Sequence, residues 1–134
     1  MGVTFDFSGA HVLVTGGTSG IGHAIARAFD DAGAAVTVTG TRADAGAYDI
    51  GLEPFTYHRC RMSDPSEVGA LAGALDALDV LVNNAGQNLP GGRSESDPDV
   101  FAEVVDINLV GAFRLATLCR PAGPTDKGSW PGPG

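Results

Sequence analysis

The sequence predicts a protein of the α/β class, in which helices cover both faces of a parallel sheet. The first observation is the order of its segments, because short runs of apolar and β-branched residues alternate with longer runs of helical periodicity. The second is an unbroken apolar run at residues 80–82, which is typical of a strand covered on both faces. The third is size and composition: 134 residues, 43% hydrophobic and 18% charged, fit one globular domain.

The first predicted unit is a strand followed by a helix. Residues 11–14 form a short apolar run that leads directly into glycines. Further on, apolar residues recur at the i, i+3, i+4, i+7 spacing of an amphipathic helix. They are Ile21, Ala24, Ile25, Ala28, Phe29 and Ala32. Gly33 then stands where the residue after a helix C-terminus is expected.

The next unit contains two strands and a helix. Residues 35–39 are rich in β-branched side chains and predict the second strand, and residues 55–61 predict the third. Asp64 has the position of an N-cap, with proline at the first helical position and Glu67 at the third. We expect this helix to continue to about Leu78.

The last predicted helix opens at Asp97 and Pro98 and continues toward Ala116. Its apolar residues are Val100, Phe101, Val104, Val105, Ile107 and Leu109. Beyond residue 120 the composition changes, because residues 121–134 hold half of the eight prolines and almost nothing apolar. We therefore predict a folded domain over residues 1–120 and a Pro/Gly-rich disordered tail over residues 121–134.

Charge and cysteine content exclude several classes of partner. The formal net charge is −8 and the pI is about 4.5, which argues against nucleic acid or an anionic membrane as partner. A small anion remains compatible, since backbone amides bind phosphate. The two cysteines lie outside any CxxC pattern, so we expect neither a disulfide framework nor a metal site. The start of the chain lacks a signal sequence and no run reaches the roughly 18 apolar residues of a membrane span, so we expect a cytoplasmic protein.

A glycine-rich segment, residues 15–22, lies between the first strand and the first helix. Glycines let the backbone turn sharply and approach a pyrophosphate, which then meets the free amides and the positive end of the helix. The alternative is a purely structural turn. Placement between strand and helix favours the nucleotide site. The candidate binding residues are Gly16, Thr18, Ser19, Gly20, Ile21 and Gly22.

A second candidate segment, Asn83 to Gly86, follows the apolar run at residues 80–82. Ligands of open α/β sheets bind at the carboxyl ends of strands, which is where this segment is expected. Asn84, Ala85 and Gly86 are therefore candidate cofactor residues. Taken alone, the segment is equally compatible with an asparagine-rich turn.

Together these segments resemble the short-chain dehydrogenase/reductase family, over about residues 5–118. Thr15, Gly16, Gly20 and Gly22 match its glycine motif, residues 83–86 match its NNAG motif, and Asn108 matches its helix asparagine. The resemblance implies a Rossmann-type parallel sheet with helices on both faces, here truncated after about four strands. It also implies that NAD or NADP binds, and that hydride passes between the nicotinamide and a small-molecule carbonyl or alcohol substrate.

The resemblance also implies residue roles. Asn84 would support the loop beneath the cofactor, and Asn108 would hold a water in a proton relay. For Asn108 the alternative is a helix asparagine that bonds to nearby backbone. Adenine contact would fall to the backbone of Met62 or to the side chain of Arg61, since arginine stands where relatives often carry an aspartate.

The cofactor preference depends on the end of the second strand. NAD-preferring relatives usually carry an acidic residue there, and this chain has Gly40. No carboxylate would repel a 2′-phosphate, and Arg42 is placed to contact one, so NADP is favoured. Alternatively Arg42 is simply solvated, and the nearby Asp44 keeps NAD as an option.

The proton-transfer residues of the family are missing. Relatives use a serine and a tyrosine with a lysine four residues later on one helix face. The only lysine here is Lys127, and Gly123 stands four residues before it. Tyr57 and Arg61 have the spacing, but in a strand they would lie roughly 13 Å apart, too far to cooperate.

Three interpretations of function follow. The chain is an NAD(P)-dependent oxidoreductase by lineage that lacks its catalytic segment, a non-catalytic nucleotide-binding or interaction fragment, or a truncated or frame-shifted remnant. The fourth strand would normally pair with a fifth, so its edge is expected to be open and to favour a homo-oligomer or other self-association.

Overall fold

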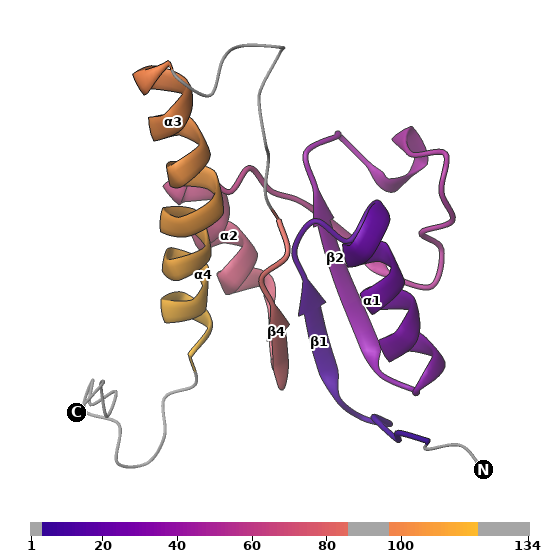
Figure 1. Cartoon of the computed structure of the whole chain (residues 1–134). Helices are drawn as coiled ribbons and strands as arrows, with labels where there is room; N and C mark the ends of the chain where they lie inside the picture. Colours follow the sequence, from indigo (N-terminus) through magenta and orange to yellow (C-terminus); the bar gives the residue numbers. More distant parts are fainter. Residues whose placement is uncertain (1–3, 86–96, 121–134) are drawn as a thin grey trace, which may run out of the picture.

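The computed structural model describes residues 4–85 and 97–120 and has an α/β architecture (Figure 1). Its sheet has four strands in the order β3-β2-β1-β4, and all neighbouring pairs are parallel. The strands are β1 (His11–Val14), β2 (Ala35–Gly40), β3 (Thr56–Arg59) and β4 (Val80–Val82). The predicted class and the four-stranded parallel sheet are confirmed.

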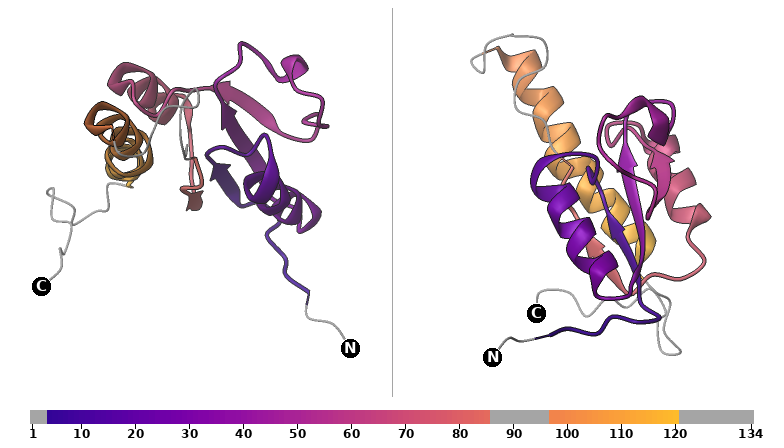
Figure 2. Two further views of the ribbon diagram at one scale, coloured as in Figure 1. Left: turned by 45° about the horizontal axis from the view of Figure 1, so that its top comes forward. Right: turned by 90° about the vertical axis from the view of Figure 1, so that its right-hand side faces the viewer.

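Helices cover the two faces of the sheet from different parts of the chain (Figures 1 and 2). On one face lies α1 (Gly20–Asp31), which contacts β1 and β2. On the other lie α2 (Pro65–Ala74) and a long helix that packs against it. That long helix comprises α3 (Pro98–Val105), the π-helical segment η3 (Asp106–Gly111) and α4 (Ala112–Cys119).

Alternation along β1 divides the core into two parts. Val12 and Val14 belong to the cluster beneath α1, and Leu13 belongs to the cluster beneath α2 and α4. Leu71 of α2 and Leu115 of α4 are fully buried in the second cluster. This arrangement explains the unbroken apolar sequence of β1, because both faces of the strand are covered.

Some element boundaries differ from the expectations. β3 is shorter than predicted, and its ladder stops at Arg59 because its partner β2 ends at Gly40. α2 ends at Ala74 rather than near residue 78. Leu75 adopts extended backbone angles, and Leu75 and Leu78 pack against the second core cluster on the way to β4.

The predicted apolar stripe of α1 is only partly correct. Gly22 and Ala26 are buried and Phe29 is half-buried, whereas Ile21 is 75% exposed and Ala28 is exposed. The reason is that α1 packs on β1 and β2 with one narrow side of the helix, which leaves Ile21 and Ala28 facing away from the sheet.

The expectation that β4 is covered on both faces is met only in part: Val80 and Val82 pack against the first core cluster, and Leu81 packs against the second. All three of its residues are only half-buried. The physical reason is its position, since β4 is an edge strand of the described sheet and pairs with β1 alone. The open fourth-strand edge expected from the sequence is therefore present among the described residues.

Candidate functional site

An open cleft of about 1010 Å³ lies at the carboxyl ends of the strands. The sequence-predicted residues that line it are Gly16, Thr18, Ser19, Gly20, Ile21, Arg42, Met62, Asn84 and Ala85. The same cleft is lined by Thr39, Gly40, Thr41, Tyr48, Cys60, Arg61, Ser63, Glu103 and Ile107. Segments far apart in the sequence thus meet at one edge of the sheet, as parallel strands require.

Thr15 connects the two motif segments. Its side chain is buried, at 1% exposure, directly after β1. The hydroxyl oxygen accepts hydrogen bonds from the backbone N–H groups of Asn84 (3.1 Å) and Ala85 (3.0 Å), and the hydroxyl donates to the carbonyl of Val82 at 3.4 Å. One hydroxyl therefore fixes the turn after β4 to the end of β1.

The side chain of Asn84 supports the glycine loop. Its side-chain amide donates to the carbonyl oxygen of Gly16 at 3.3 Å. A Cβ at Gly22 would overlap both that amide and the Gly16 carbonyl. Gly16 itself has φ +67°, and a Cβ there would lie 2.9 Å from the Ala85 Cα. The glycines are required because the loop, the helix start and the Asn84 turn approach one another closely.

The strand β2 adds a further contact that sequence reasoning missed. The hydroxyl of Thr39 accepts the backbone N–H of Gly16 at 3.2 Å and is buried at 1% exposure. The available signal was a threonine directly before Gly40, at the carboxyl end of the strand. Thr39 and Thr15 together fix the backbone of the glycine loop from two strands.

The first turn of α1 faces the cleft. Ser19 is the N-cap, and its side chain makes no capping hydrogen bond. Ser19, Gly20 and Ile21 are exposed and line the cleft. The first N–H groups of a helix have no partner within the helix and carry partial positive charge, so this end of α1 suits an anion.

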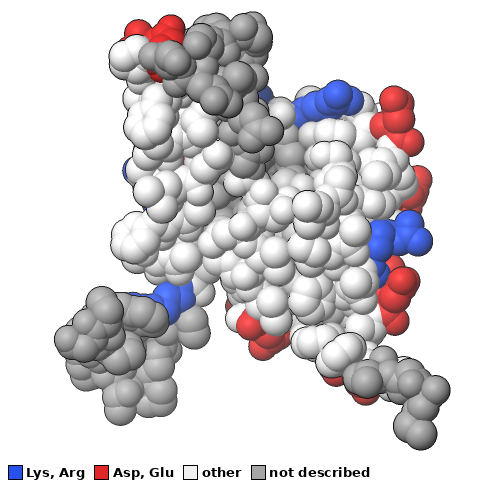
Figure 3. All heavy atoms as spheres, in the orientation of Figure 1, with Lys and Arg blue, Asp and Glu red and all other residues white. Residues whose placement is uncertain are grey.

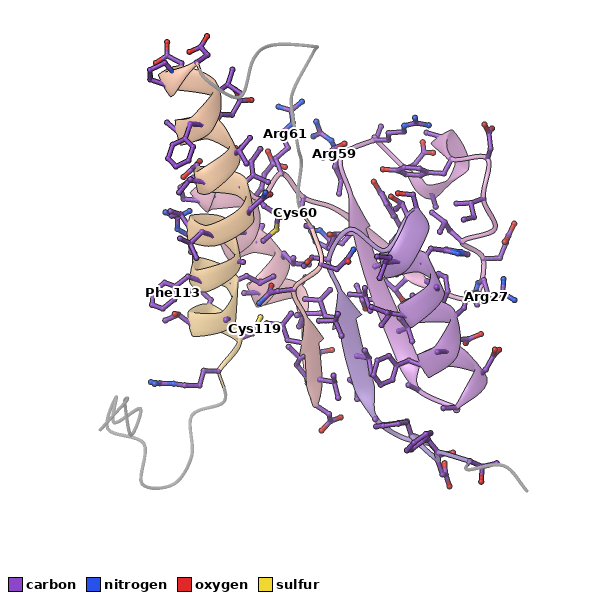
Figure 4. The ribbon with its side chains drawn as sticks, viewed as in Figure 1. Arg27, Arg59, Cys60, Arg61, Phe113 and Cys119 are labelled. Carbon is purple, nitrogen blue, oxygen red and sulfur yellow. The ribbon has the colours of Figure 1, made fainter. Side chains whose placement is uncertain are left out.

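The ends of β2 and β3 carry arginines. Figure 4 shows Arg59 and Arg61 at this end of the molecule, where basic side chains are also visible in the space-filling view (Figure 3). The Arg59 guanidinium donates to the carbonyl of Thr41 at 3.1 Å. Arg42 and Arg61 are exposed on the cleft lining. Positive charge thus gathers here in a chain of net charge −8.

The end of β3 is fixed by α2. The Glu67 carboxylate accepts the backbone N–H of Arg61 at 2.9 Å. Met62 is buried at 5% exposure, and Cys60 is buried beside it. Burial, together with the charges of Glu67 and Asp64, raises the pKa of the Cys60 thiol to about 11. The thiol is therefore protonated and unreactive at neutral pH.

Two predicted site residues that the structure describes, Gly22 and Asn108, are not part of the lining. Gly22 is buried behind the loop and contributes space rather than a contact. Asn108 is exposed within η3 and does not line the cleft, although Glu103 and Ile107 of the same long helix do. Gly86 lies outside the described residues, as do residues 121–134, the predicted tail.

Tyr57 and Arg61 do not form an acid–base pair. Tyr57 lies on β3, and its hydroxyl donates to the carbonyl of Arg42 at 2.7 Å.

Within residues 4–85 and 97–120, no helix is long and apolar enough to cross a membrane. The same residues hold no cluster of three His, Cys, Asp or Glu side chains arranged for a metal ion.

Comparison with known proteins gives consistent matches. A family pattern described as short chain dehydrogenase matches residues 10–129. L-fucose dehydrogenase of Oryctolagus cuniculus is 36% identical over 121 residues, and momilactone A synthase of Oryza sativa subsp. japonica is 35% identical over 132 residues. These alignments cover 86% and 90% of this chain but 43% and 48% of those proteins.

Solved structures agree. The Pseudomonas aeruginosa RhlG/NADP active-site complex superposes with a TM-score of 0.71 at 30% identity, over 89% of this chain and 50% of that one. The chain thus spans about half the length of the relatives it matches. With its parallel sheet and the contact of its two motif segments at the strand ends, the chain belongs to the short-chain dehydrogenase family.

Proposed function

We propose that the cleft binds a nicotinamide dinucleotide, with NADP preferred over NAD, and that the chain is the cofactor-binding half of an NAD(P)-dependent oxidoreductase. The observation that carries this proposal is the hydrogen-bonded assembly of Thr15, Asn84 and Gly16, which fixes the glycine loop above the strand ends. That assembly presents the first turn of α1 to the cleft, where a pyrophosphate fits the free amides.

The lining suggests how the dinucleotide would be held. The loop from Gly16 to Ile21 would bind the pyrophosphate. Asn84 and Ala85, with Gly86 of the same motif, would support the nicotinamide half. Arg61 and Met62 would flank the adenine. Gly22 allows the close approach of loop and turn.

The preference for NADP is supported by charge. β2 ends at Gly40, which carries no carboxylate, and Arg42 follows on the cleft lining. A guanidinium pairs well with a phosphate on the ribose 2′ oxygen. Asp44 lies at the N-cap of the short helix η1 (Ala45–Ala47), where it precedes that turn.

When bound, the nicotinamide supplies hydride exchange with a carbonyl or alcohol carbon. The described residues would supply binding and orientation, and the hydroxyls of Tyr48 and Tyr57 are engaged in hydrogen bonds around the Arg42 backbone. The Tyr-x-x-x-Lys pattern of the family is absent from the sequence. We therefore propose that these 134 residues bind cofactor without turnover, and that Asn108 would contribute to a proton relay only in a chain carrying the missing residues.

Titration calorimetry with NADP, NAD and ADP tests the proposal. Saturable binding of all three, tightest for NADP, is the expected result. The absence of saturable binding by a chain whose circular dichroism spectrum is folded would overturn it. Incubation of NADPH with a panel of aldehydes and ketones, followed at the nicotinamide absorbance, should show no oxidation above the protein-free rate.

A second role, self-association, is favoured by a separate observation. A groove of about 470 Å³ runs between β4 and α4 and is lined by Leu78, Asp79, Leu81, Phe113, Ala116, Thr117, Cys119 and Arg120. Phe113 is 72% exposed and projects outward in Figure 4. An open strand edge beside apolar surface favours pairing with another chain. We propose that the chain forms a homo-oligomer through this side. We also propose that the protein is cytoplasmic, which cell fractionation would test.

A further inference from the structure

A closed set of hydrogen bonds surrounds the backbone of Arg42 at the rim of the cleft. The Arg42 N–H donates to the Tyr48 hydroxyl oxygen at 3.1 Å, and the Tyr57 hydroxyl donates to the Arg42 carbonyl at 2.7 Å. The two hydroxyl oxygens lie 3.1 Å apart. The chain segments involved are the loop after β2 and the middle of β3, which are not adjacent in sequence.

The direction of each hydrogen bond follows from the number of protons. Each phenol has one hydroxyl proton. Because Tyr57 donates its proton to the Arg42 carbonyl, Tyr57 accepts from Tyr48. Tyr48 in turn accepts from the Arg42 N–H. Both backbone groups of Arg42 are therefore satisfied by this one ring. Burial and the hydrogen bond with Tyr48 raise the pKa of Tyr57, which favours the protonated form that donates to the Arg42 carbonyl.

The ring also determines where the Arg42 guanidinium lies. Its Cζ lies 4.9 Å from the centroid of the Tyr48 ring, and one terminal nitrogen donates to the carbonyl of Ala47 at 2.6 Å. A guanidinium has five N–H donors, so this arrangement fixes its plane and leaves most donors for an anion. The Tyr48 hydroxyl lies directly over Gly40, where any Cβ would overlap it.

We propose that Tyr48 and Tyr57 are positioning residues that preorganise Arg42 for a phosphomonoester on the ribose 2′ oxygen, and so set the preference for NADP. This inference rests on the proposed dinucleotide site. The reasoning is that an unconstrained arginine would lose side-chain freedom on binding, whereas a stacked guanidinium has already lost it. Tyr48 supplies the stacking surface, and Tyr57 fixes the backbone from which Arg42 extends.

The test compares two probes that differ only in the 2′-phosphate: adenosine 2′,5′-bisphosphate and adenosine 5′-monophosphate. Titration calorimetry on the whole chain should show tighter binding of the bisphosphate. Tyr57→Phe should weaken bisphosphate binding about 3- to 10-fold, equivalent to one neutral hydrogen bond, and change monophosphate binding less than about 2-fold. Arg42→Gln should remove the difference between the probes.

Graded variants separate positioning from general damage. Tyr48→Phe keeps the stacking ring and should act like Tyr57→Phe, whereas Tyr48→Leu should weaken bisphosphate binding further. His58→Gln is the matched control, because His58 neighbours Tyr57 on β3 and its ring contacts only the Arg59 carbonyl among the described hydrogen bonds. It should leave the ratio of the two affinities unchanged.

Four results would overturn the inference. Equal weakening of both probes by Tyr57→Phe would indicate a purely structural role, and unchanged binding of both would indicate none. Wild-type protein that binds both probes equally would remove the selectivity while leaving the proposed dinucleotide site in place. If folded wild-type protein binds neither probe, the proposed function itself fails, and the inference fails with it.

Discussion

At the scale of single residues, the cleft depends on close approaches that tolerate no extra atoms. Gly22 is the clearest case, since its missing side chain leaves space for the Asn84 amide and the Gly16 carbonyl. Thr15 is the complementary case, in which one buried hydroxyl serves two backbone donors. Neither residue has to touch a ligand directly for the site to depend on it.

Gly22→Ala should lower both stability and dinucleotide affinity. The added Cβ forces the Asn84 amide or the glycine loop to move, and overpacking of this kind costs about 1–3 kcal/mol of unfolding free energy. Urea unfolding and titration with NADP measure the two effects. Gly69→Ala is the control, because a Cβ there meets nothing within 4 Å in α2, and it should stabilise by about 0.5–1 kcal/mol. Equal stability of the two variants would contradict the argument.

Thr15→Val should destabilise the chain although its shape is nearly unchanged. The N–H groups of Asn84 and Ala85 lose their acceptor, and a buried donor left unsatisfied costs about 1–3 kcal/mol. Thr15→Ser retains the hydroxyl and should recover most of the lost free energy. Chemical denaturation measures both variants, and a Ser variant as unstable as the Val variant would show that packing of the methyl group, not the hydroxyl, is what matters.

At the scale of elements, the start of α2 shows how a local signal positions a distant segment. The Asp64 carboxylate accepts from the backbone N–H groups of Ser66 and Glu67, as the sequence predicts for an N-cap. Glu67 departs from the reciprocal capping pattern, because its carboxylate accepts the N–H of Arg61 rather than that of Asp64. This contact fixes the chain after β3 where it lines the cleft.

The Asp64 cap should be sensitive to pH. Hydrogen bonds from the Ser66 side chain, the Ser66 N–H and the Glu67 N–H lower the pKa of Asp64 in the folded chain. Its stabilising effect is therefore present above the unfolded pKa of about 3.9 and is lost as pH falls through the lower folded value. Asp64→Ala should lower Tm at pH 7, and the difference from wild type should shrink toward pH 2. Asp64→Asn keeps an acceptor and should melt above the Ala variant at pH 7; a difference that stays constant with pH would contradict the cap.

At the scale of the whole molecule, the exposed surface is not evenly distributed. The side formed by β4 and α4 carries an apolar groove, and β4 has no partner on its outer edge among the described residues. Figure 2 shows this side beyond the sheet, opposite α1. A surface of this kind is typical of an interaction site or of a region prone to self-association.

Phe113→Glu should weaken self-association of the chain. A carboxylate in the groove beside Leu81 opposes burial of that surface against a second copy. Sedimentation velocity over a concentration series measures this. The wild-type protein should form larger species at a lower concentration than the variant does. Phe5→Glu is the matched control, because Phe5 is 69% exposed and does not line the groove. Wild-type protein that stays monomeric at all concentrations would contradict the prediction.

Much of the fold could be predicted because its signals are local. The apolar runs placed β1 and β4 at their observed bounds, and the proline after Asp64 placed the start of α2. Boundaries that depend on partners were less predictable: β3 ends where β2 ends, and α2 ends where Leu75 turns into the core. The exposure of Ile21 was also missed, since periodicity does not reveal how wide a face the sheet will cover.

The α/β class, the family and the two motif segments could be predicted from local patterns, because strand length, helical periodicity and glycine spacing are properties of neighbouring residues. The groups that meet in the site depend on how the chain folds in three dimensions. Folding paired Thr15 with the Asn84 turn, placed Thr39 beneath Gly16, and brought Tyr48 and Tyr57 around Arg42. Parallel strand pairing joins segments separated by whole helices, and no local pattern records such contacts.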